Sequence, residues 1–260
     1  MHTPRSSSHS SRRSSGGTPS RPSRRPSGDT APVGGRHELG QNFLVDRQVV
    51  GRIVALVAAT HGPIVELGAG GGALTHRLAA LDRPLTAIEI DPARAEALRV
   101  RLGRRARIVT ADALDWRYPA EPHVVVGNIP FHVTTAMLRM LLARHRWTEA
   151  VLLTQWEAAR RRCGVGGTSQ LTVQWAPWYE FDLDGRVPRA AFRPAPSVDG
   201  GLFTIRRRRR PLVPVARRRD YQAWVADVFG GRTRALGRRR PRDLGPEEWV
   251  GMWAGPRGGR

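Results

Sequence analysis

The residues with the clearest chemical meaning are a run of glycines and an acid that follows it. The glycines come after a short apolar segment, 64–67, and before a segment with helical periodicity; they are Gly68, Gly70, Gly71 and Gly72. Glycine lets the backbone approach a ligand closely, and the start of a helix offers free N–H groups. Glu89 ends a second apolar segment, where a carboxylate can bind both ribose hydroxyls of a nucleoside. The pattern predicts a cofactor with a nucleoside part. The alternative is that Glu89 only caps the helix beginning at Pro92.

Two more acids bear on which cofactor is bound. Asp112 follows a third predicted strand, 108–110, and so reaches the same carboxyl edge, where it can accept a hydrogen bond from an adenine amino group. Glu66 directly precedes the glycines. A nicotinamide dinucleotide and S-adenosylmethionine both fit the glycine pattern, but an acid beside a pyrophosphate is unfavourable, whereas a methionine ammonium group tolerates one. Glu66 therefore favours S-adenosylmethionine.

The tetrapeptide Asn128-Ile129-Pro130-Phe131 follows a fourth predicted strand, 124–126. It resembles the active-site motif of amino-methyltransferases, which alkylate exocyclic nitrogens of bases. In that chemistry the Asn128 side-chain oxygen and the Ile129 carbonyl accept both N–H bonds of an adenine N6, which aligns the nitrogen for in-line transfer. Pro130 rigidifies the turn, and Phe131 offers a face for stacking of an extruded base. We expect no general base and assign His132 a supporting polar role.

Two further segments make the resemblance specific. Leu39–Leu44 (LGQNFL) and Phe192–Asp199 (FRPAPSVD) are similar to the opening motif and the late, pocket-closing motif of rRNA adenine N6-methyltransferases. With the motifs above, the resemblance spans residues 37–205, and it is to the erythromycin-resistance (Erm) branch. It implies methylation of one adenine N6 in the peptidyl-transferase region of 23S rRNA, and resistance to macrolides, lincosamides and streptogramins. It also implies a set of contacts to S-adenosylmethionine: Asn42, Leu44, Gly68, Glu89, Asp112 and Asn128. Phe131 departs from the more usual tyrosine.

The elements that position these residues alternate between strand and helix. Val50, Ile53, Val54 and Val57 have helical spacing after Asp46, a predicted N-cap. Strands are predicted at 64–67, 85–90, 108–110, 124–126 and 151–154. Helices are predicted at 74–81, at 135–144 and from Pro92, where Asp91 is the predicted N-cap. This alternation predicts an α/β fold with a parallel, doubly wound, Rossmann-like methyltransferase sheet. Segments 179–183 and 201–207 are expected to add a hairpin-like edge, and Trp224, Val228, Trp249 and Trp253 a small helical appendage.

Composition sets the remaining limits. The 260 residues carry 43 Lys+Arg, all of them arginine, against 22 Asp+Glu, a formal net charge of +21. This excess points to nucleic acid as the partner. The absence of a long apolar run excludes a membrane span, and a single cysteine, Cys163, fits a reducing cytoplasm and no cysteine-built metal site. We predict an Arg/Ser-rich disordered tail at 1–36, a catalytic domain at 37–207 and a basic helical RNA-binding domain at 208–260. The tail is interpreted either as an RNA-tethering arm or as an extension without function.

The expected protein is a cytoplasmic monomer that acts on 23S rRNA, either naked or in a large-subunit precursor, and that needs no metal. Arginine runs at 206–219 and 232–242 are favoured as phosphate contacts because they adjoin the pocket-closing segment. The main alternative is a small-subunit rRNA adenine dimethyltransferase, which shares nearly all of these motifs. A nucleotide-dependent dehydrogenase and a non-catalytic RNA-binding protein are further alternatives.

Overall fold

The computed structural model describes residues 42–144 and 146–255, all of which belong to the unit spanning 37–260. The predicted tail at 1–36 and the first part of the opening motif, 39–41, lie outside the described residues. No described helix is long and apolar enough to cross a membrane.

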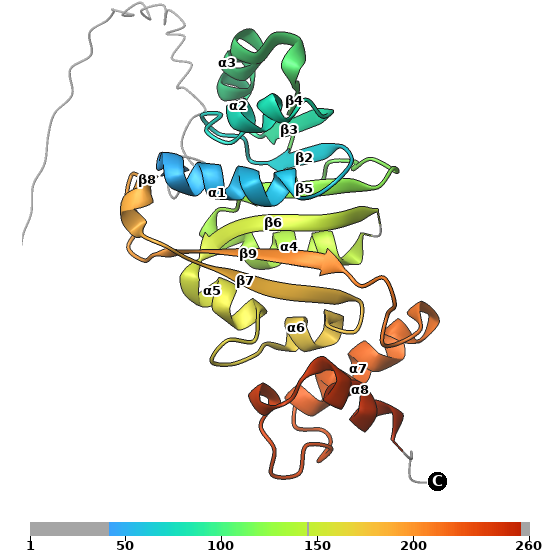
Figure 1. Ribbon diagram of the computed structural model, residues 1–260. Coiled ribbons are helices and arrows are strands. Elements are labelled where there is room, and N and C mark those ends of the chain that lie inside the picture. The colour runs from blue at the N-terminus through green and yellow to red at the C-terminus, as the bar shows by residue number, and fades with distance from the viewer. Residues whose placement is uncertain (1–41, 145, 256–260) are drawn as a thin grey trace, which may run out of the picture. The chain divides into compact units, whose positions relative to one another are not determined.

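A seven-stranded sheet forms the centre of the fold (Figure 1), with strand order β4-β3-β2-β5-β6-β9-β7. The strands are β2 (Ile64–Leu67), β3 (Leu85–Glu89), β4 (Arg107–Thr110), β5 (His123–Asn128), β6 (Trp147–Gln155), β7 (Tyr179–Val187) and β9 (Gly200–Arg207). The pairs among β2 to β6 are all parallel, so their carboxyl ends share one edge. The Rossmann-like α/β fold is confirmed.

The last two strands of the sheet differ from the expected hairpin-like edge in their lateral order. β9 pairs antiparallel with β6 on one side and with β7 on the other, so the last strand lies inside the sheet and β7 forms its edge. The pairing of the two late segments was predicted from their closeness in sequence. The insertion of β9 was not, because chain order does not specify lateral order.

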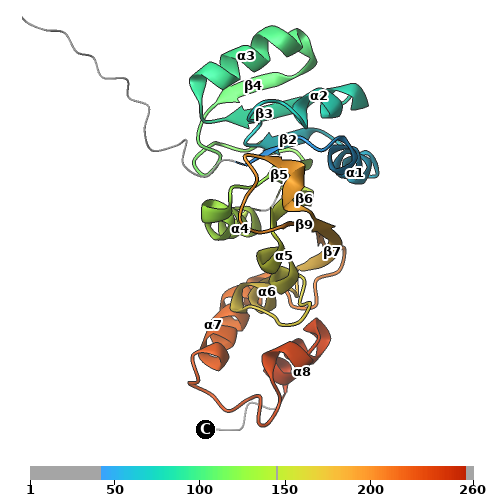
Figure 2. The same ribbon diagram turned by 90° about the vertical axis from the view of Figure 1, so that its left-hand side faces the viewer.

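Helices cover both faces of the sheet (Figure 2). One face packs on α1 (Arg47–Ala58), α2 (Thr75–Leu78) and α3 (Pro92–Leu102), and the other on α4 (Thr134–Ala143), α5 (Trp156–Arg162) and α6 (Gln170–Trp175). α7 (Arg218–Phe229) packs on α6. Alternate strand residues divide between the faces: Val124 and Val126 lie in the first core and Val125 in the second. This alternation is what a strand buried on both sides produces.

Local signals place the helices that border the carboxyl edge. Asp46 caps α1 by accepting hydrogen bonds from the amides of Gln48 and Val49, and Asp91 caps α3 in the same way, with Pro92 at the first helical position. Both caps were predicted. The predicted helix at 74–81 is α2 followed by a 3₁₀ turn, Ala79–Leu81.

The C-terminal residues form α7 and α8 (Pro246–Ala254), which lie beyond the β7 edge in Figure 1. Tyr221 of α7 and Trp249 of α8 join the same apolar core as Trp178 and Tyr179 of the sheet region. An aromatic series links them, with Trp178 and Tyr221 ring centroids 5.8 Å apart. The division of the chain at residue 207 stays a prediction.

Candidate active site

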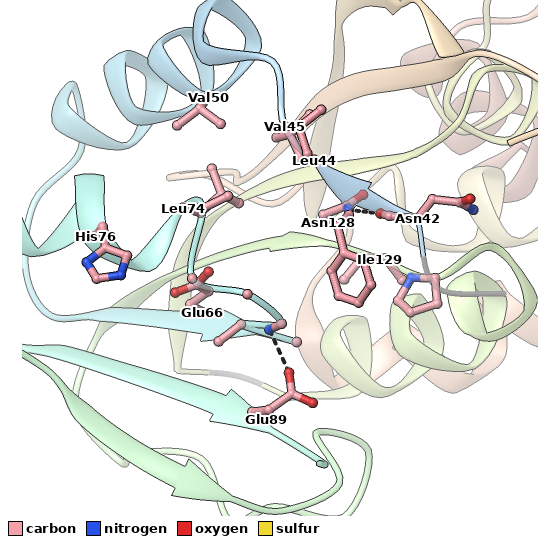
Figure 3. Close-up of a pocket in the computed structure, with 18 of the residues that line it drawn as sticks. Asn42, Leu44, Val45, Val50, Glu66, Leu74, His76, Glu89, Asn128 and Ile129 are labelled. Atoms are coloured by element: carbon pink, nitrogen blue, oxygen red, sulfur yellow. Dashed lines mark hydrogen bonds between the residues drawn. The ribbon is translucent and has the colours of Figure 1, made fainter. Parts of the chain in front are cut away.

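One cavity of about 750 Å³ opens at the carboxyl edge of the parallel strands, and most of the predicted site residues line it (Figure 3). They are Asn42, Leu44, Gly68, Glu89, Asn128, Ile129, Pro130 and Phe131. These residues come from β1 (Phe43–Leu44), from the glycine turn after β2, from the end of β3 and from the turn after β5. The chain therefore brings its cofactor-type and base-type motifs into a single cavity.

The glycine turn is tightly packed against its surroundings. Gly72 has φ +85°, and a Cβ there would lie 2.5 Å from Cδ2 of Leu98 on α3. Gly70 has φ +54°, and a Cβ there would lie 3.2 Å from two ring carbons of Phe43. Both positions need the left-handed region and the missing side chain of glycine.

Glu89 ties the glycine turn to the end of β3. Its carboxylate accepts hydrogen bonds from the Gly70 amide (2.6 Å) and the Asp91 amide (2.9 Å), and the residue is only 3% exposed. Because Asp91 itself caps α3, the helix does not depend on Glu89 for its cap. Glu89 instead presents a carboxylate, held by two backbone donors, to the wall of the cavity.

Glu66 is a second acid in the cavity wall, and it is fully enclosed. It is 1% exposed, and its Oε2 has no hydrogen-bond partner among the described residues. Burial raises the pKa of Glu66 to about 8, and the nearby negative charge of Glu89 acts in the same direction. The protonated form therefore predominates at neutral pH in the protein without a ligand.

The turn after β5 is fixed by hydrogen bonds on both sides. The Asn128 side chain donates from Nδ2 to the Asn42 carbonyl (2.9 Å), and the Ile129 amide donates to the Leu153 carbonyl on β6 (2.8 Å). A carbonyl only accepts, so the Asn42 contact determines which way the Asn128 amide faces. Oδ1 is left as the acceptor.

Two hydrogen bonds from the start of the following helix fix the Pro130 carbonyl. It accepts from the Val133 amide (3.1 Å) and from the Thr134 hydroxyl (3.3 Å), which lies 2.6 Å from the buried Thr154 hydroxyl. Thr134 gives its proton to the carbonyl, so Thr154 must donate to Thr134. Phe131 follows this anchored turn, half-buried at the cavity wall.

The opening and late motifs meet in a two-stranded ribbon beside the cavity. β1 pairs antiparallel with β8 (Phe192–Arg193), with Leu44 opposite Phe192. Asp199 closes the late segment by accepting from the Arg186 side chain (2.6 Å) and from the Arg189 amide (2.8 Å). Leu44 and Phe192, which are 148 positions apart in the chain, thus lie together at one border of the site.

Asp112 is the one predicted site residue that does not line the cavity. It lies just after β4, exposed, and its carboxylate accepts from the Leu114 amide (2.8 Å). The preceding amide, of Ala111, donates to the Glu89 carbonyl (3.0 Å), so Asp112 is on the adjoining rim. A role in binding adenine stays a prediction.

Several cavity residues were not identified from the sequence. They are Phe43, Val45, Arg47, Val50, Leu74, His76, Arg77 and Ile90. Their positions beside quoted motifs were the available signal, but only the folded chain turns them inward. The pKa of His76 is lowered, chiefly by burial and then by the charges of Arg101 and Arg105. No group of three or more acidic, histidine or cysteine side chains suited to a metal occurs among the described residues.

An α/β sheet of this order, with an acid-bordered glycine turn and an Asn-x-Pro-aromatic turn in one cavity, defines a Rossmann-like S-adenosylmethionine-dependent methyltransferase. The ribosomal RNA adenine dimethylase family matches residues 34–244, and the chain belongs to that family. A dehydrogenase and a non-catalytic RNA-binding protein are thereby excluded.

Comparison with individual relatives shows to which branch of this family the chain is most similar. The chain is 52% identical over 204 residues to an rRNA adenine N-6-methyltransferase of Corynebacterium diphtheriae, covering 78% of this chain and 81% of that protein. It is 45% identical over 249 residues to the mycinamicin-resistance protein MyrB of Micromonospora griseorubida, covering 86% and 80%. The crystal structure of the 23S rRNA methyltransferase ErmE superposes with a TM-score of 0.74 at 33% identity, covering 82% of this chain and 98% of that one. The predicted Erm-type rRNA adenine N6-methyltransferase is confirmed.

Proposed function

We propose that the chain methylates N6 of one adenine in the peptidyl-transferase region of 23S rRNA and thereby confers resistance to macrolides, lincosamides and streptogramins. The observation that carries the proposal is the single cavity lined by both the glycine turn and the Asn128–Phe131 turn. Support for the large-subunit target comes from the similarity to ErmE and to a mycinamicin-resistance protein.

The cavity fits S-adenosylmethionine in volume and in the chemistry of its walls. Glu89 is placed to accept hydrogen bonds from ribose hydroxyls, and the Oε2 atom of the enclosed Glu66, which has no partner among the described residues, offers an acceptor for an ammonium group, whose positive charge would favour the ionised carboxylate. Gly68, Leu44 and Asn42 would complete the contacts, with Asp112 on the rim. When bound, the cofactor supplies an electrophilic methyl group.

The residues of the turn after β5 would prepare the nucleophile. Asn128 Oδ1 and the Ile129 carbonyl accept the two N6–H bonds, which raises electron density on nitrogen and directs its lone pair along the line of transfer. Pro130, held by Thr134, keeps the two acceptors in place. Phe131 stacks on the adenine after it leaves the RNA helix. The proton leaves N6 after transfer, so no side chain needs to act as a base.

The charges of the described arginines refine the expected RNA contacts. In the runs favoured from the sequence, several arginines are engaged with acids: Arg206, Arg208, Arg217, Arg232, Arg239 and Arg242. By contrast, Arg139, Arg161 and Arg162 form no ion pair with an acid among the described residues, and Arg162 reaches from α5 to Thr135 on α4 (3.4 Å) while also donating to Ser169 Oγ (2.6 Å). They lie on α4 and α5, the helices that follow the strands bordering Asn128. We propose this cluster as a phosphate contact near the target base.

Labelled rRNA tests the proposal. Purified 23S and 16S rRNA from an unmethylated strain are incubated with the protein and methyl-labelled S-adenosylmethionine, with Asn128→Ala as the control. We expect N6-methylated adenine in 23S rRNA alone, located by mass spectrometry in the peptidyl-transferase region. Label in 16S rRNA alone would establish the small-subunit alternative. In a susceptible host, the chain but not the control variant raises the inhibitory concentration of a macrolide.

We further propose that the protein acts as a monomer in the cytoplasm, where its rRNA substrate lies. Light scattering coupled to size-exclusion chromatography would give a mass near 28.8 kDa for the free chain. A mass of twice that value contradicts a monomer.

A further inference from the structure

Phe43 lies across the glycine turn at the cofactor end of the cavity. Its Cδ1 and Cε1 atoms are 3.2 Å from the point where a Cβ of Gly70 would stand, so the ring rests directly on that glycine. Phe43 and Gly70 both line the cavity. The aromatic ring of β1 therefore forms part of the cavity wall over the turn.

Arg94, in the first turn of α3, holds this ring. Its guanidinium carbon is 4.8 Å from the Phe43 ring centroid, within the range of a cation–π contact. The Arg94 side chain is 29% exposed, and its ion pair with Asp91 is long, at 3.8 Å. Partial burial strengthens a cation–π contact because less water competes for the cation.

The contact with Phe43 is connected to both ends of the site. The Gly70 amide beneath the ring donates to Glu89 (2.6 Å), and the residue before Phe43 gives its carbonyl to Asn128 (2.9 Å). A shift of the Phe43 ring would therefore loosen the turn that carries the Glu89 contact. It would also disturb the Asn42 carbonyl that orients the Asn128 amide.

We propose that Arg94 is a positioning residue for cofactor binding, which acts by holding Phe43 on Gly70. Arg94 does not line the cavity and has no assigned role in the reaction. Arg94 acts by keeping the cavity wall in place, and not through a direct electrostatic interaction with the charge of the cofactor. The inference depends on the cofactor cavity alone, so it holds whichever rRNA is methylated.

Calorimetry with two ligands distinguishes the loss of a positioning contact from the loss of a nearby positive charge. S-adenosylmethionine carries a net positive charge, whereas its demethylated product S-adenosylhomocysteine does not. Loss of a nearby cation by Coulomb's law alone would tighten binding of the first and leave the second unchanged. Loss of a positioning contact weakens both. For Arg94→Met we expect about three- to tenfold weaker binding of both ligands, as a cation–π contact of ordinary strength allows.

Companion variants test the route through Phe43. Arg94→Lys keeps a cation over the ring and should recover most of the affinity. Phe43→Leu should weaken binding similarly, and the double variant Arg94→Met/Phe43→Leu should lose no more than the worse single variant. The matched control is Arg104→Met, an exposed arginine in the turn that follows the same helix, with expected affinities within twofold of the native protein. In turnover assays the Arg94→Met loss should fall on KM for the cofactor.

Three results would overturn the inference. One is unchanged affinity for both ligands in Arg94→Met. Another is tighter binding of S-adenosylmethionine alone, which would mean a charge effect. The third is additive losses in the double variant, which would mean that Arg94 does not act through Phe43. If Arg94→Met does not fold, the two remaining variants still test the inference. It then requires that Phe43→Leu weakens binding of both ligands and that Arg94→Lys keeps nearly native affinity for both.

Discussion

The side-chain amide of Asn128 donates its hydrogen bond to the backbone carbonyl of Asn42, a residue 86 positions earlier in the chain. The turn that would hold the target nitrogen is thus oriented by the segment that lines the cofactor end of the cavity. The orientation of the Asn128 amide, and with it the position of its acceptor oxygen, therefore depends on where the backbone of Asn42 lies.

Asn128→Ala should reduce methylation by about 10²–10³-fold, the usual loss for an interaction made mainly in the transition state. Affinity for S-adenosylmethionine should change only a few-fold, as calorimetry will show. Asn128→Asp should be no better, because a carboxylate cannot donate to the Asn42 carbonyl and the two oxygens repel. Near-native turnover of either variant would contradict the proposed role of the amide.

Glu89→Ala should weaken binding of S-adenosylmethionine by about 1.5–3 kcal/mol, the range for hydrogen bonds to a charged group. The Gly70 amide loses its acceptor as well, so the turn becomes less ordered. Titration calorimetry measures the first effect, and amide exchange at Gly70 the second. Unchanged affinity together with faster exchange would restrict Glu89 to a structural role.

Glu66→Gln should change how stability depends on pH. The folded pKa of Glu66 is raised from 4.5 to about 8, so between these values the unfolded chain releases a proton that the folded protein keeps. The contribution of Glu66 to the free energy of unfolding therefore falls as pH rises, by about 1 kcal/mol per pH unit. Urea unfolding at pH 5.5 and 7.5 should show native protein losing stability relative to Glu66→Gln. Parallel profiles would mean that Glu66 is ionised in the fold.

Gly127→Ala should destabilise the protein by about 1–3 kcal/mol, as overpacking in a core does. A Cβ at Gly127 would stand 2.9 Å from the Leu67 carbonyl oxygen and 3.1 Å from Ile129 Cδ1, between β5 and β2. Gly51→Ala is the matched control, since no atom lies within 4 Å of its Cβ in α1. Gly51→Ala should raise the free energy of unfolding by about 0.5–1 kcal/mol, because alanine has a higher helix propensity than glycine. Thermal unfolding that ranks the two variants equally would contradict this packing.

Deletion of residues 1–36 should leave the melting temperature unchanged and make RNA affinity less dependent on salt. The segment holds seven arginines and one acid, so its phosphate contacts would release counterions on binding. Filter binding at several salt concentrations measures the slope. An identical slope would show that the segment does not touch RNA, and a lower melting temperature would move the domain boundary before residue 37.

The sequence was informative where structure follows from neighbouring residues. Asp46 and Asp91 were predicted as caps because a cap depends on two or three adjacent residues, and the glycine turn because its φ angles exclude other side chains. The position of β9 could not be predicted, since antiparallel insertion depends on competition among strands distant in sequence.

Within the site, motif residues were predictable and their supports were not. Asn128 and Glu89 were identified by residue type and place, but the contacts to Asn42 and Gly70 join segments whose spacing carries no such information. Likewise, the arginine runs in the sequence indicated a large positive charge, but they did not indicate which arginines form ion pairs with acids. Only the fold shows that Arg206 forms an ion pair with Asp182 (2.9 Å), whereas Arg139 forms none with an acid among the described residues.

The inserted position of β9 has a consequence for synthesis of the chain. Among the described strands, β7 pairs with β9 alone and β1 with β8 alone. A nascent chain that has emerged only through residue 187 therefore carries two strand segments without their partners, β1 and β7. Both are completed by the same short stretch, residues 192–207. The pairing of β1, whose residues line the cofactor cavity, and the joining of β7 to the sheet therefore both wait until residues 192–207 have been synthesised.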